Sequence, residues 1–318
     1  NLNYIPTISG SVYEQFSLKY ASVAVQEADT LLYYDENTST FNSTTVKWLD
    51  ATISGTGPNY SFSRISPSLS DNKNYNIYVK AGDFAGNESS VGSPVVIRYD
   101  ITPPVSDITF PANGGFYNFI SSVTGYAYEP NSNPSGLKGV QIRIQQQFGS
   151  YYYWNGTLWV SNETWLSPVN ISGVNANWTK NTQLPPPNNS PTGLEDNGLY
   201  EIKARAFDVA GNTQTVLLTG SVFRFDVSSP TATIDIPQNG SRYNSITQIS
   251  GTAQDAYNVK FPLVRIYDIP LNAYWNGSIW AKDTTDDSRY PEIWHVANSS
   301  SSTGQPFNWS WNSSGVIW

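Results

Sequence analysis

Acidic residues flank the two proline-containing links of this chain, and their carboxylates could do metal chemistry. Asp100 and Asp226 precede the links, and Asp107 and Asp235 follow them. Calcium takes roughly six to eight oxygen ligands in proteins, so carboxylates that meet at such a junction could bind it and stiffen the link. Asp100 and Asp226 are therefore candidate calcium ligands. The dense Asp-x-Asp-x-Asp spacing of a dedicated calcium loop is missing, so solvated aspartates at strand ends are the alternative, and we expect no other cofactor.

Catalytic chemistry has few residues to use. His295 is the only histidine among 318 residues, and the chain has no cysteine. Neither a Gly-x-Ser-x-Gly elbow nor a metal-ligand spacing accompanies this histidine. Paired carboxylates for glycoside hydrolysis would have to meet in the fold, and acidic residues are sparse. We predict that the protein is not an enzyme and has no catalytic residue.

Two aromatic segments have the sequence of β-hairpins. Asn155-Gly156 and Asn276-Gly277 each lie between aromatic and β-branched residues, which is the strongest short signal for a hairpin. A type I′ turn is predicted at both, because asparagine and glycine tolerate the positive φ angles that this turn needs at its two central residues. The aromatic residues beside the turns are Tyr152, Trp154, Trp159, Tyr274, Trp275 and Trp280.

These rings allow two interpretations. They could form cross-strand pairs or pack on the neighbouring sheet, as large rings in hairpins usually do. Alternatively, exposed rings could stack on sugars or contact a neighbouring subunit. Burial of Trp154 and Trp275 would favour the structural interpretation, whereas coplanar exposed rings flanked by polar side chains would favour glycan binding.

Asn-x-Ser/Thr sequons are frequent in this sequence. They could carry N-linked glycans on an extracellular surface. Alternatively, a surface rich in asparagine, serine and threonine produces sequons by chance. The candidate glycosylation sites are Asn162, Asn170, Asn177, Asn188, Asn298 and Asn308.

The chain that carries these residues is a tandem repeat. The pentapeptide from Asp208 to Asn212 repeats the one from Asp83 to Asn87, 125 residues earlier, in the pattern Asp-x-Ala-Gly-Asn. An alternating apolar run precedes each copy and a second apolar run follows it, which predicts two antiparallel strands joined by a turn. In each turn the aspartate can accept backbone N–H groups and the glycine supplies a positive φ angle. The predicted structural turn residues are Asp83, Gly86, Asn87, Asp208, Gly211 and Asn212.

The repeat frame extends beyond these turns. A strand follows Asn113-Gly114 and Asn239-Gly240, and we expect it to end at Gly125 and at Gly251. In this frame the first copy would lack its opening strand and the third its closing hairpin. We therefore expect a window of a longer surface protein, and prefer this to a subunit whose missing hairpin a neighbour supplies.

Composition excludes several kinds of partner. Charged residues make up 13% of the chain, compared with roughly 25% in an average soluble protein. The net charge of −8, without clusters of lysine and arginine, argues against nucleic acid and anionic membranes. Because every apolar stretch is much shorter than the roughly 18 residues of a transmembrane helix, we expect no membrane insertion in this segment. Cysteine and methionine are absent, so stability must come from packed sheets.

Short strands broken by glycine, proline, asparagine and aspartate predict an all-β protein made of antiparallel sandwiches. The two Asp-x-Ala-Gly-Asn turns, each followed by a closing strand, an aspartate and a proline-containing link, resemble the tandem immunoglobulin-like domains of bacterial and archaeal cell-surface proteins. The resemblance implies tandem immunoglobulin-like β-sandwiches. The repeat is longer than the roughly 100 residues of such a domain, so we expect the Trp-rich β-hairpins to be insertions in the sandwiches. The expected domains are residues 1–100, 101–226 and 227–318.

The functional hypothesis is a structural extracellular protein, namely a prokaryotic surface stalk, filament or surface-layer component without catalysis. A carbohydrate-binding or adhesin module that uses the exposed Trp and Tyr hairpins is the alternative. The expected partners are other copies of the protein or neighbouring repeats of a longer chain, with glycans as the partner in the alternative. The expected location is the outer surface of a prokaryotic cell.

Overall fold

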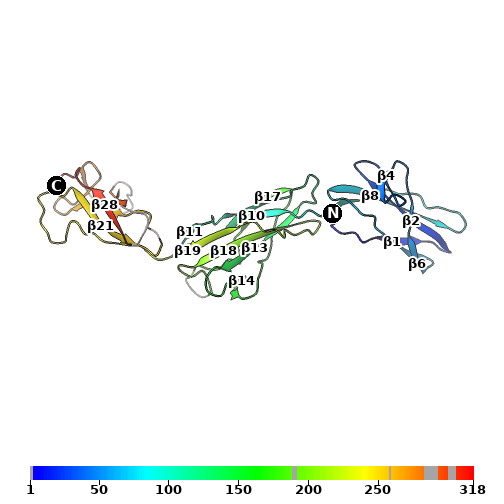
Figure 1. The fold of residues 1–318 in the computed structure, drawn as a ribbon, viewed down its shortest axis with the longest axis horizontal. Helices are drawn as coiled ribbons and strands as arrows, with labels where there is room; N and C mark the ends of the chain where they lie inside the picture. Colours follow the sequence, from blue (N-terminus) through cyan, green and yellow to red (C-terminus); the bar gives the residue numbers. More distant parts are fainter. Residues whose placement is uncertain (1–2, 188–191, 258, 283–292, 300–305) are drawn as a thin grey trace. The chain divides into compact units, whose positions relative to one another are not determined.

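A computed structural model describes residues 3–187, 192–257, 259–282, 293–299 and 306–318 (Figure 1). The described segments are strands, turns and loops, and they contain no helix long and apolar enough to span a bilayer. The chain divides into two compact units, Asn1–Phe225 and Asp226–Trp318. The first unit contains two hydrophobic cores in different parts of the sequence and the second contains one. The fold is therefore all-β, a tandem array of immunoglobulin-like β-sandwiches, as predicted.

The first sandwich is formed by nine strands. They are β1 (Thr7–Tyr13), β2 (Leu18–Glu27), β3 (Tyr33–Asp35), β4 (Thr40–Ser43), β5 (Leu49–Asp50), β6 (Thr52–Thr56), β7 (Asn59–Ile65), β8 (Lys73–Asp83) and β9 (Val95–Tyr99). One sheet has the order β1-β7-β6, and the other has the order β4-β3-β2-β8-β9 with β5 paired to β2. Ala21, Val23, Leu49 and Phe62 form the core between these sheets.

The second sandwich has the largest core. Its strands are β10 (Val105–Phe110), β11 (Phe116–Tyr117), β12 (Val123–Tyr128), β13 (Leu137–Gln146), β14 (Tyr153–Trp154), β15 (Trp159–Val160), β16 (Val169–Asn170), β17 (Asn175–Lys180), β18 (Leu199–Asp208) and β19 (Ser221–Phe225). One sheet has the order β10-β12-β17, and the other has the order β11-β19-β18-β13-β14-β15 with β16 paired to β13. In Figure 1, β13 and β18 lie side by side at the centre of this sheet.

The third sandwich is made of shorter strands within the second unit. They are β20 (Thr231–Ala232), β21 (Gln248–Gln254), β22 (Leu263–Val264), β23 (Tyr267–Asp268), β24 (Ala273–Trp275), β25 (Trp280–Lys282), β26 (His295–Val296), β27 (Asn298–Ser299) and β28 (Phe307–Asn312). The described sheets have the orders β20-β21-β28-β27, β22-β26 and β23-β24-β25. Ile249, Val264, Phe307 and Trp309 are buried in its core.

The alternating apolar runs form the strands that the sequence predicts. In β18 every second residue is buried and the residues between them are partly exposed. This alternation faces Tyr200, Ile202, Ala204 and Ala206 into the core, because successive side chains of a strand point to opposite faces. The same periodicity therefore places Asp208, the last residue of β18, on the buried side.

The repeated glycine lies inside a strand, so the predicted strand ends at Gly125 and Gly251 are wrong. Gly125 lies within β12 and pairs directly with Trp178 of β17. A Cβ atom at Gly125 would lie 2.3 Å from the Trp178 ring and 2.1 Å from the carbonyl oxygen of Asp107. Gly251 pairs with Trp309 in the same way. Glycine is needed at both positions because a ring and a neighbouring strand occupy the space of a side chain.

Candidate functional site

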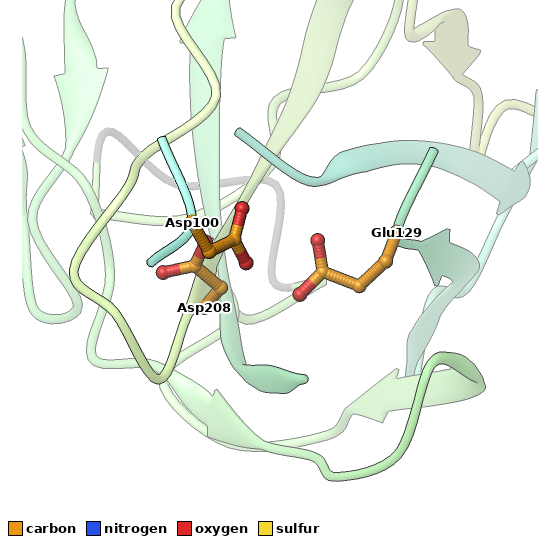
Figure 2. Close-up of side chains that lie close together, drawn as sticks. All are labelled: Asp100, Glu129 and Asp208. Carbon is orange, nitrogen blue, oxygen red and sulfur yellow. The ribbon is translucent and has the colours of Figure 1, made fainter. Parts of the chain in front are cut away.

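Three acidic side chains converge in the second sandwich (Figure 2). Asp100 follows β9, Glu129 follows β12, and Asp208 ends β18. Each offers a carboxylate oxygen, and these oxygens all lie within 4.8 Å of one another. Asp100 and Asp208 are 0% exposed and Glu129 is 8% exposed. Among the described residues, this is the one group of three potential metal-ligating side chains at such a spacing.

Asp208 is held by the turn that follows it. Its Oδ1 accepts the backbone N–H groups of Gly211 at 2.7 Å and Asn212 at 2.8 Å, and its Oδ2 accepts the Asn212 amide at 2.7 Å. Gly211 has a φ angle of +100°, which an L side chain rarely adopts. The Asp-x-Ala-Gly-Asn pattern therefore fixes the position and the rotamer of the Asp208 carboxylate.

Asp100 is also held by donors that follow it in the sequence. Its Oδ2 accepts the backbone N–H of Ser135 at 2.6 Å, and its Oδ1 accepts the Asn131 amide at 3.0 Å and the Thr102 N–H at 3.2 Å. The Asn212 amide also donates to the backbone carbonyl of Asp100, at 2.8 Å. Asn212 thus joins the turn at Asp208 to the residue that begins the link.

Glu129 differs from the two aspartates because neither of its carboxylate oxygens has a hydrogen-bond partner. Burial and, after it, the negative charges of Asp208 and Asp100 together raise the pKa of Glu129 to about 7. The nearby backbone N–H of Gly136 opposes this shift in pKa but does not form a hydrogen bond with either oxygen. Glu129 is therefore a buried acid whose charge the protein itself does not compensate.

The cluster has no cationic partner among the ion pairs formed by the described residues. Three ionised carboxylates at these distances repel each other by about 3 kcal/mol per pair, for an effective dielectric constant of about 20. Removing a charge from water without a partner adds a further cost. Either a proton or a bound cation must therefore balance the excess negative charge.

Oxygen is the only kind of donor that this cluster offers. Besides the three carboxylates, the side-chain carbonyl oxygen of Asn131 is buried and has no hydrogen-bond partner. The amide of the same side chain donates to Asp100, so this carbonyl lies next to the cluster. Carboxylate and amide oxygens are the ligands of hard cations such as calcium, whereas zinc and copper favour nitrogen and sulfur.

The sequence points to one residue of the cluster, Asp100, as a metal ligand. Asp107 lies in β10, where its Oδ1 accepts the neighbouring Ile108 N–H at 2.8 Å. Asp226 belongs to the other unit, where its Oδ1 accepts the N–H of Ser228 at 3.1 Å. The sequence does not predict Glu129 as a ligand, and it predicts Asp208 only as a structural residue of the turn. The repeat itself could have indicated Glu129, because Asp255 occupies the corresponding position 126 residues later and an acidic residue therefore recurs there.

The Trp-rich hairpins pack into their own sandwiches. Trp154 and Trp275 are each 2% exposed. Trp154 donates its ring N–H to the carbonyl of Gln183 at 2.7 Å and meets Trp159 edge to face, with 5.3 Å between the ring centroids. Trp275 and Trp280 form the same edge-to-face pair at 5.5 Å. Burial removes Trp154 and Trp275 from contact with an external ligand.

The flanking residues of these hairpins are less enclosed. Trp159 is half-buried, stacks on Tyr200 and donates to the carbonyl of Gly193 at 2.9 Å. Tyr274 is half-buried, and the Arg265 guanidinium lies 4.7 Å from the centre of its ring. Tyr152 is exposed. Of the six predicted contact residues, Tyr152 is therefore the one exposed side chain, at 39%.

The predicted type I′ turns are wrong. The cross-strand pair Trp154 and Trp159 encloses a loop of four residues, and only the glycine of its Asn-Gly pair, Gly156, has a positive φ angle. The side chain of Asn155 accepts the backbone N–H groups of Thr157 and Leu158, both at 2.9 Å. The loop from Asn276 to Ile279 has the same bonds. Asparagine therefore acts through its side chain, as in an Asx turn, and does not need a positive φ angle.

A cation covers one tryptophan on each sandwich. The Lys80 ammonium lies 5.1 Å from the Trp48 ring centre. The guanidinium groups of Arg205 and Arg265 lie 4.2 Å from the Trp165 ring and 4.7 Å from the Trp294 ring, respectively. Such pairs shield a large ring from water without a ligand. Much of the aromatic content of this chain is therefore used for packing.

Tyr126 and Tyr128 form the clearest exposed aromatic pair of the second sandwich. Both point outward from β12 with 38% and 37% exposure, and their rings are 18° from parallel with centroids 6.3 Å apart. Asn175 and Asn177 of β17 line the same shallow surface. This geometry has the coplanar rings and polar neighbours that sugar stacking requires, although the sequence gives no reason to select these residues.

The described sequon asparagines are all exposed. They are Asn162, Asn170, Asn177, Asn298 and Asn308. Asn188 lies outside the described residues. Asn177 and Asn308 alternate with the buried Trp178 and Trp309, so the pleat of β17 and β28 turns them to solvent.

Comparison with known proteins identifies no family for this chain. No family model matches the sequence, and neither does any curated protein. Among solved structures, the fibronectin(III)-like modules of CbhA from Clostridium thermocellum are 15% identical, over 70% of this chain and 86% of theirs, with a TM-score of 0.30. A marsupial T cell receptor is 11% identical, over 82% of this chain and 80% of its own, with a TM-score of 0.29. Similarity this low carries no argument about function, and the fold assignment depends on the sheets described above.

Proposed function

We propose that this chain is a structural, non-catalytic spacer built of immunoglobulin-like modules at the surface of a prokaryotic cell, as part of a stalk, filament or surface layer. Its role is to hold other parts of a longer chain, or neighbouring copies, at a defined separation. Repetition of one small module is an economical way to provide such length.

The observation that carries this proposal is the way the link after β9 is fastened. Asp71 of the first sandwich accepts the Ile101 N–H at 2.8 Å and is also hydrogen-bonded by the Thr102 hydroxyl. On the other side, Asp100 accepts the Ser135 N–H. A flexible tether would leave these groups to water, whereas a spacer needs a link with few accessible conformations.

Further hydrogen bonds reinforce this link. The Arg98 guanidinium donates to the carbonyl of Pro134, and Asn72 exchanges hydrogen bonds with Ser132 and Asn133. None of these bonds joins two charged groups, so they depend little on salt concentration. They support a semi-rigid junction within the first unit.

The surface supports an extracellular location. It is rich in uncharged polar residues, and the described sequon asparagines are exposed. Glycans on these asparagines would protect a surface protein and keep it soluble. The inward packing of Trp154 and Trp275 favours the structural role over sugar binding by the hairpins.

The spacer role can be tested by fluorescence resonance energy transfer. The chain has no cysteine, so the exposed residues Thr44 and Thr157 can be changed to cysteine for dye labelling. We expect a narrow single-molecule distribution of transfer efficiency. Replacing residues 100–104 by glycine and serine should broaden it. An equally broad distribution in both chains would contradict the spacer role.

The Tyr126 and Tyr128 pair supports a second candidate function, carbohydrate binding by the outer face of β12. Stacking of the two tyrosine rings on a sugar would need both residues and would not depend on the structure of the link. The test is binding of the chain to immobilised polysaccharides with and without the double substitution Tyr126→Ala and Tyr128→Ala. Equal retention of both proteins would exclude this pair as a glycan site.

A further inference from the structure

We propose that Asp100, Glu129 and Asp208 form a calcium site that ties the link after β9 to the second sandwich (Figure 2). Calcium binding goes beyond the spacer role. It depends on this cluster alone, so the site can be correct even if the spacer role or the cell-surface location is wrong. Asn131 supplies a fourth side-chain oxygen.

Glu129 provides the reason to look beyond a chance cluster of acids. Its side chain is more than nine-tenths buried and points toward Asp100 and Asp208, yet both of its oxygens lack a hydrogen-bond partner. Buried polar atoms are nearly always satisfied in folded proteins, and an exception calls for a missing ion or water. Two neighbouring negative charges make a cation the matching ligand.

The two aspartates are oriented in advance. Backbone and side-chain N–H groups hold Asp208 through Gly211 and Asn212, and hold Asp100 through Ser135 and Asn131. The Oδ2 atom of each aspartate accepts one hydrogen bond, which leaves a lone pair for a metal, whereas each Oδ1 atom accepts two. Such outer hydrogen bonds position the ligands of metal sites and are part of their affinity.

The donor set selects calcium among the common divalent cations. Both Glu129 oxygens and the Oδ2 atom of each aspartate are available, and the Asn131 carbonyl and water can complete the roughly six to eight ligands that calcium takes. Magnesium requires a smaller, near-octahedral shell and keeps most of its water. The cluster contains neither histidine nor cysteine, which disfavours zinc.

The position of Asp100 means that a bound ion would affect the link. Asp100 directly follows β9 of the first sandwich, whereas Glu129 and Asp208 belong to the second. An ion bound to all three therefore holds the start of the link against the second sandwich. Calcium would limit the motion of this link in addition to stabilising the fold.

Calorimetric titration of the chelator-treated 318-residue chain with calcium chloride tests the site. We expect one tight equivalent with half-saturation below about 1 mM, within the range of extracellular calcium modules. The melting temperature should rise with calcium concentration, because a ligand that binds only the folded state stabilises it. Magnesium chloride at the same concentrations should give a much smaller rise.

Two substitutions and a matched control identify the ligands. Glu129→Gln preserves the shape of the side chain and should weaken calcium binding at least tenfold, as should Asp100→Asn. Asp83→Asn changes the corresponding turn of the first sandwich, in which Asn87 makes the same two hydrogen bonds to the carboxylate, but this turn lies outside the cluster. It should leave calcium affinity unchanged.

Two results would overturn the site. One is a wild-type chain whose heat of mixing and melting temperature do not respond to calcium. The other is an unchanged calcium affinity in both Glu129→Gln and Asp100→Asn.

Trypsin cleavage after Arg98, followed by mass spectrometry, tests the effect on the link. Calcium should slow this cleavage in the wild type and not in Glu129→Gln. Cleavage that is unchanged by saturating calcium would overturn the tie between link and sandwich.

Discussion

The first and second sandwiches contain the same turn, but only the second places it in a buried cluster. Asn87 donates to Asp83 through its backbone and its side chain, both at 2.8 Å, and Asn212 bonds to Asp208 in the same way. Asp83 is partly exposed, whereas Asp208 is fully buried. The repeated motif therefore builds a turn wherever it occurs, and it becomes a candidate site only where other elements cover it.

The covering elements explain the difference. In the second sandwich, Asp100 and Glu129 face the turn. In the repeat frame Glu14 corresponds to Glu129, but its Oε1 accepts the nearby Phe16 N–H at 3.0 Å. Glu14 is thus satisfied locally, whereas Glu129 has no such partner. The comparison shows that neighbouring structure, rather than the motif, decides the chemistry.

The largest expected difference between the two sandwiches concerns the corresponding strand glycines, Gly125, which is buried, and Gly10, which is exposed. Gly125→Ala should reduce the stability of the second sandwich by at least about 3 kcal/mol, because the new Cβ meets both Trp178 and the β10 backbone. Gly10→Ala should cost the first sandwich about 1 kcal/mol, since its Cβ meets only the Phe62 ring, which can shift. Urea unfolding of both variants measures the difference. Equal costs would show that the opening strand β10 does not tighten this position.

Substitution of the two corresponding glutamates should also affect the stability of the two sandwiches differently, but here the second sandwich should gain stability. At pH 8 without calcium, Glu129→Gln should stabilise the second sandwich by about 2 kcal/mol, because it removes an uncompensated buried charge. Glu14→Gln should change stability by less than about 0.5 kcal/mol. Chelator-treated proteins are compared by denaturant unfolding. A loss of stability in Glu129→Gln would mean that its carboxylate has a partner within the protein.

The pH dependence of the metal-free chain should follow from the same group. The folded-state pKa of Glu129 is raised from 4.5 to about 7, so the folded state retains its proton longer than the unfolded chain does. Stability from this group is present below about pH 4.5, falls as the pH rises through 7, and levels off above about pH 8. The difference in unfolding free energy between wild type and Glu129→Gln, measured from pH 5 to pH 8, isolates this effect. A difference that does not vary with pH would contradict it.

The smallest expected effects come from the cations that cover tryptophans. Arg205→Met should destabilise the second sandwich by about 1 kcal/mol, because it removes the contact with Trp165 and two hydrogen bonds to Gln141. Lys80→Met should cost the first sandwich about 0.5 kcal/mol, since Lys80 lies farther from its ring. Thermal melts of the two variants give the ranking. The reverse order would mean that the Lys80 pair with Glu88 contributes more than its exposure suggests.

Local periodicity was sufficient to predict the strands, and long-range contacts explain most of the failures. The alternation in β8 and β18 arises from the pleat itself, so it can be read from the sequence. The role of Gly125 depends on Trp178, 53 positions later, and without that contact a glycine resembles a strand end. The interior of β12 was therefore not predictable from its own residues.

The candidate site was predictable only in part for the same reason. Asp100 stands beside a link and attracts attention as a possible ligand, whereas Glu129 is an isolated acid in its own segment. Its neighbours Asp100 and Asp208 are 29 and 79 positions away, so only the fold brings them together. The burial of Trp154 was likewise undecided by the sequence, because exposed and buried hairpins share the same aromatic pattern.

The division of the cluster between successive repeats affects how it can be inherited. Asp100 belongs to the repeat that precedes the one supplying Glu129 and Asp208. Serial duplication of a whole repeat reproduces all three carboxylates at a new junction. A single repeat transferred into an unrelated protein brings only two of them, and its new neighbour must provide the third. Natural selection for this cluster would therefore favour growth by duplication over the exchange of single domains.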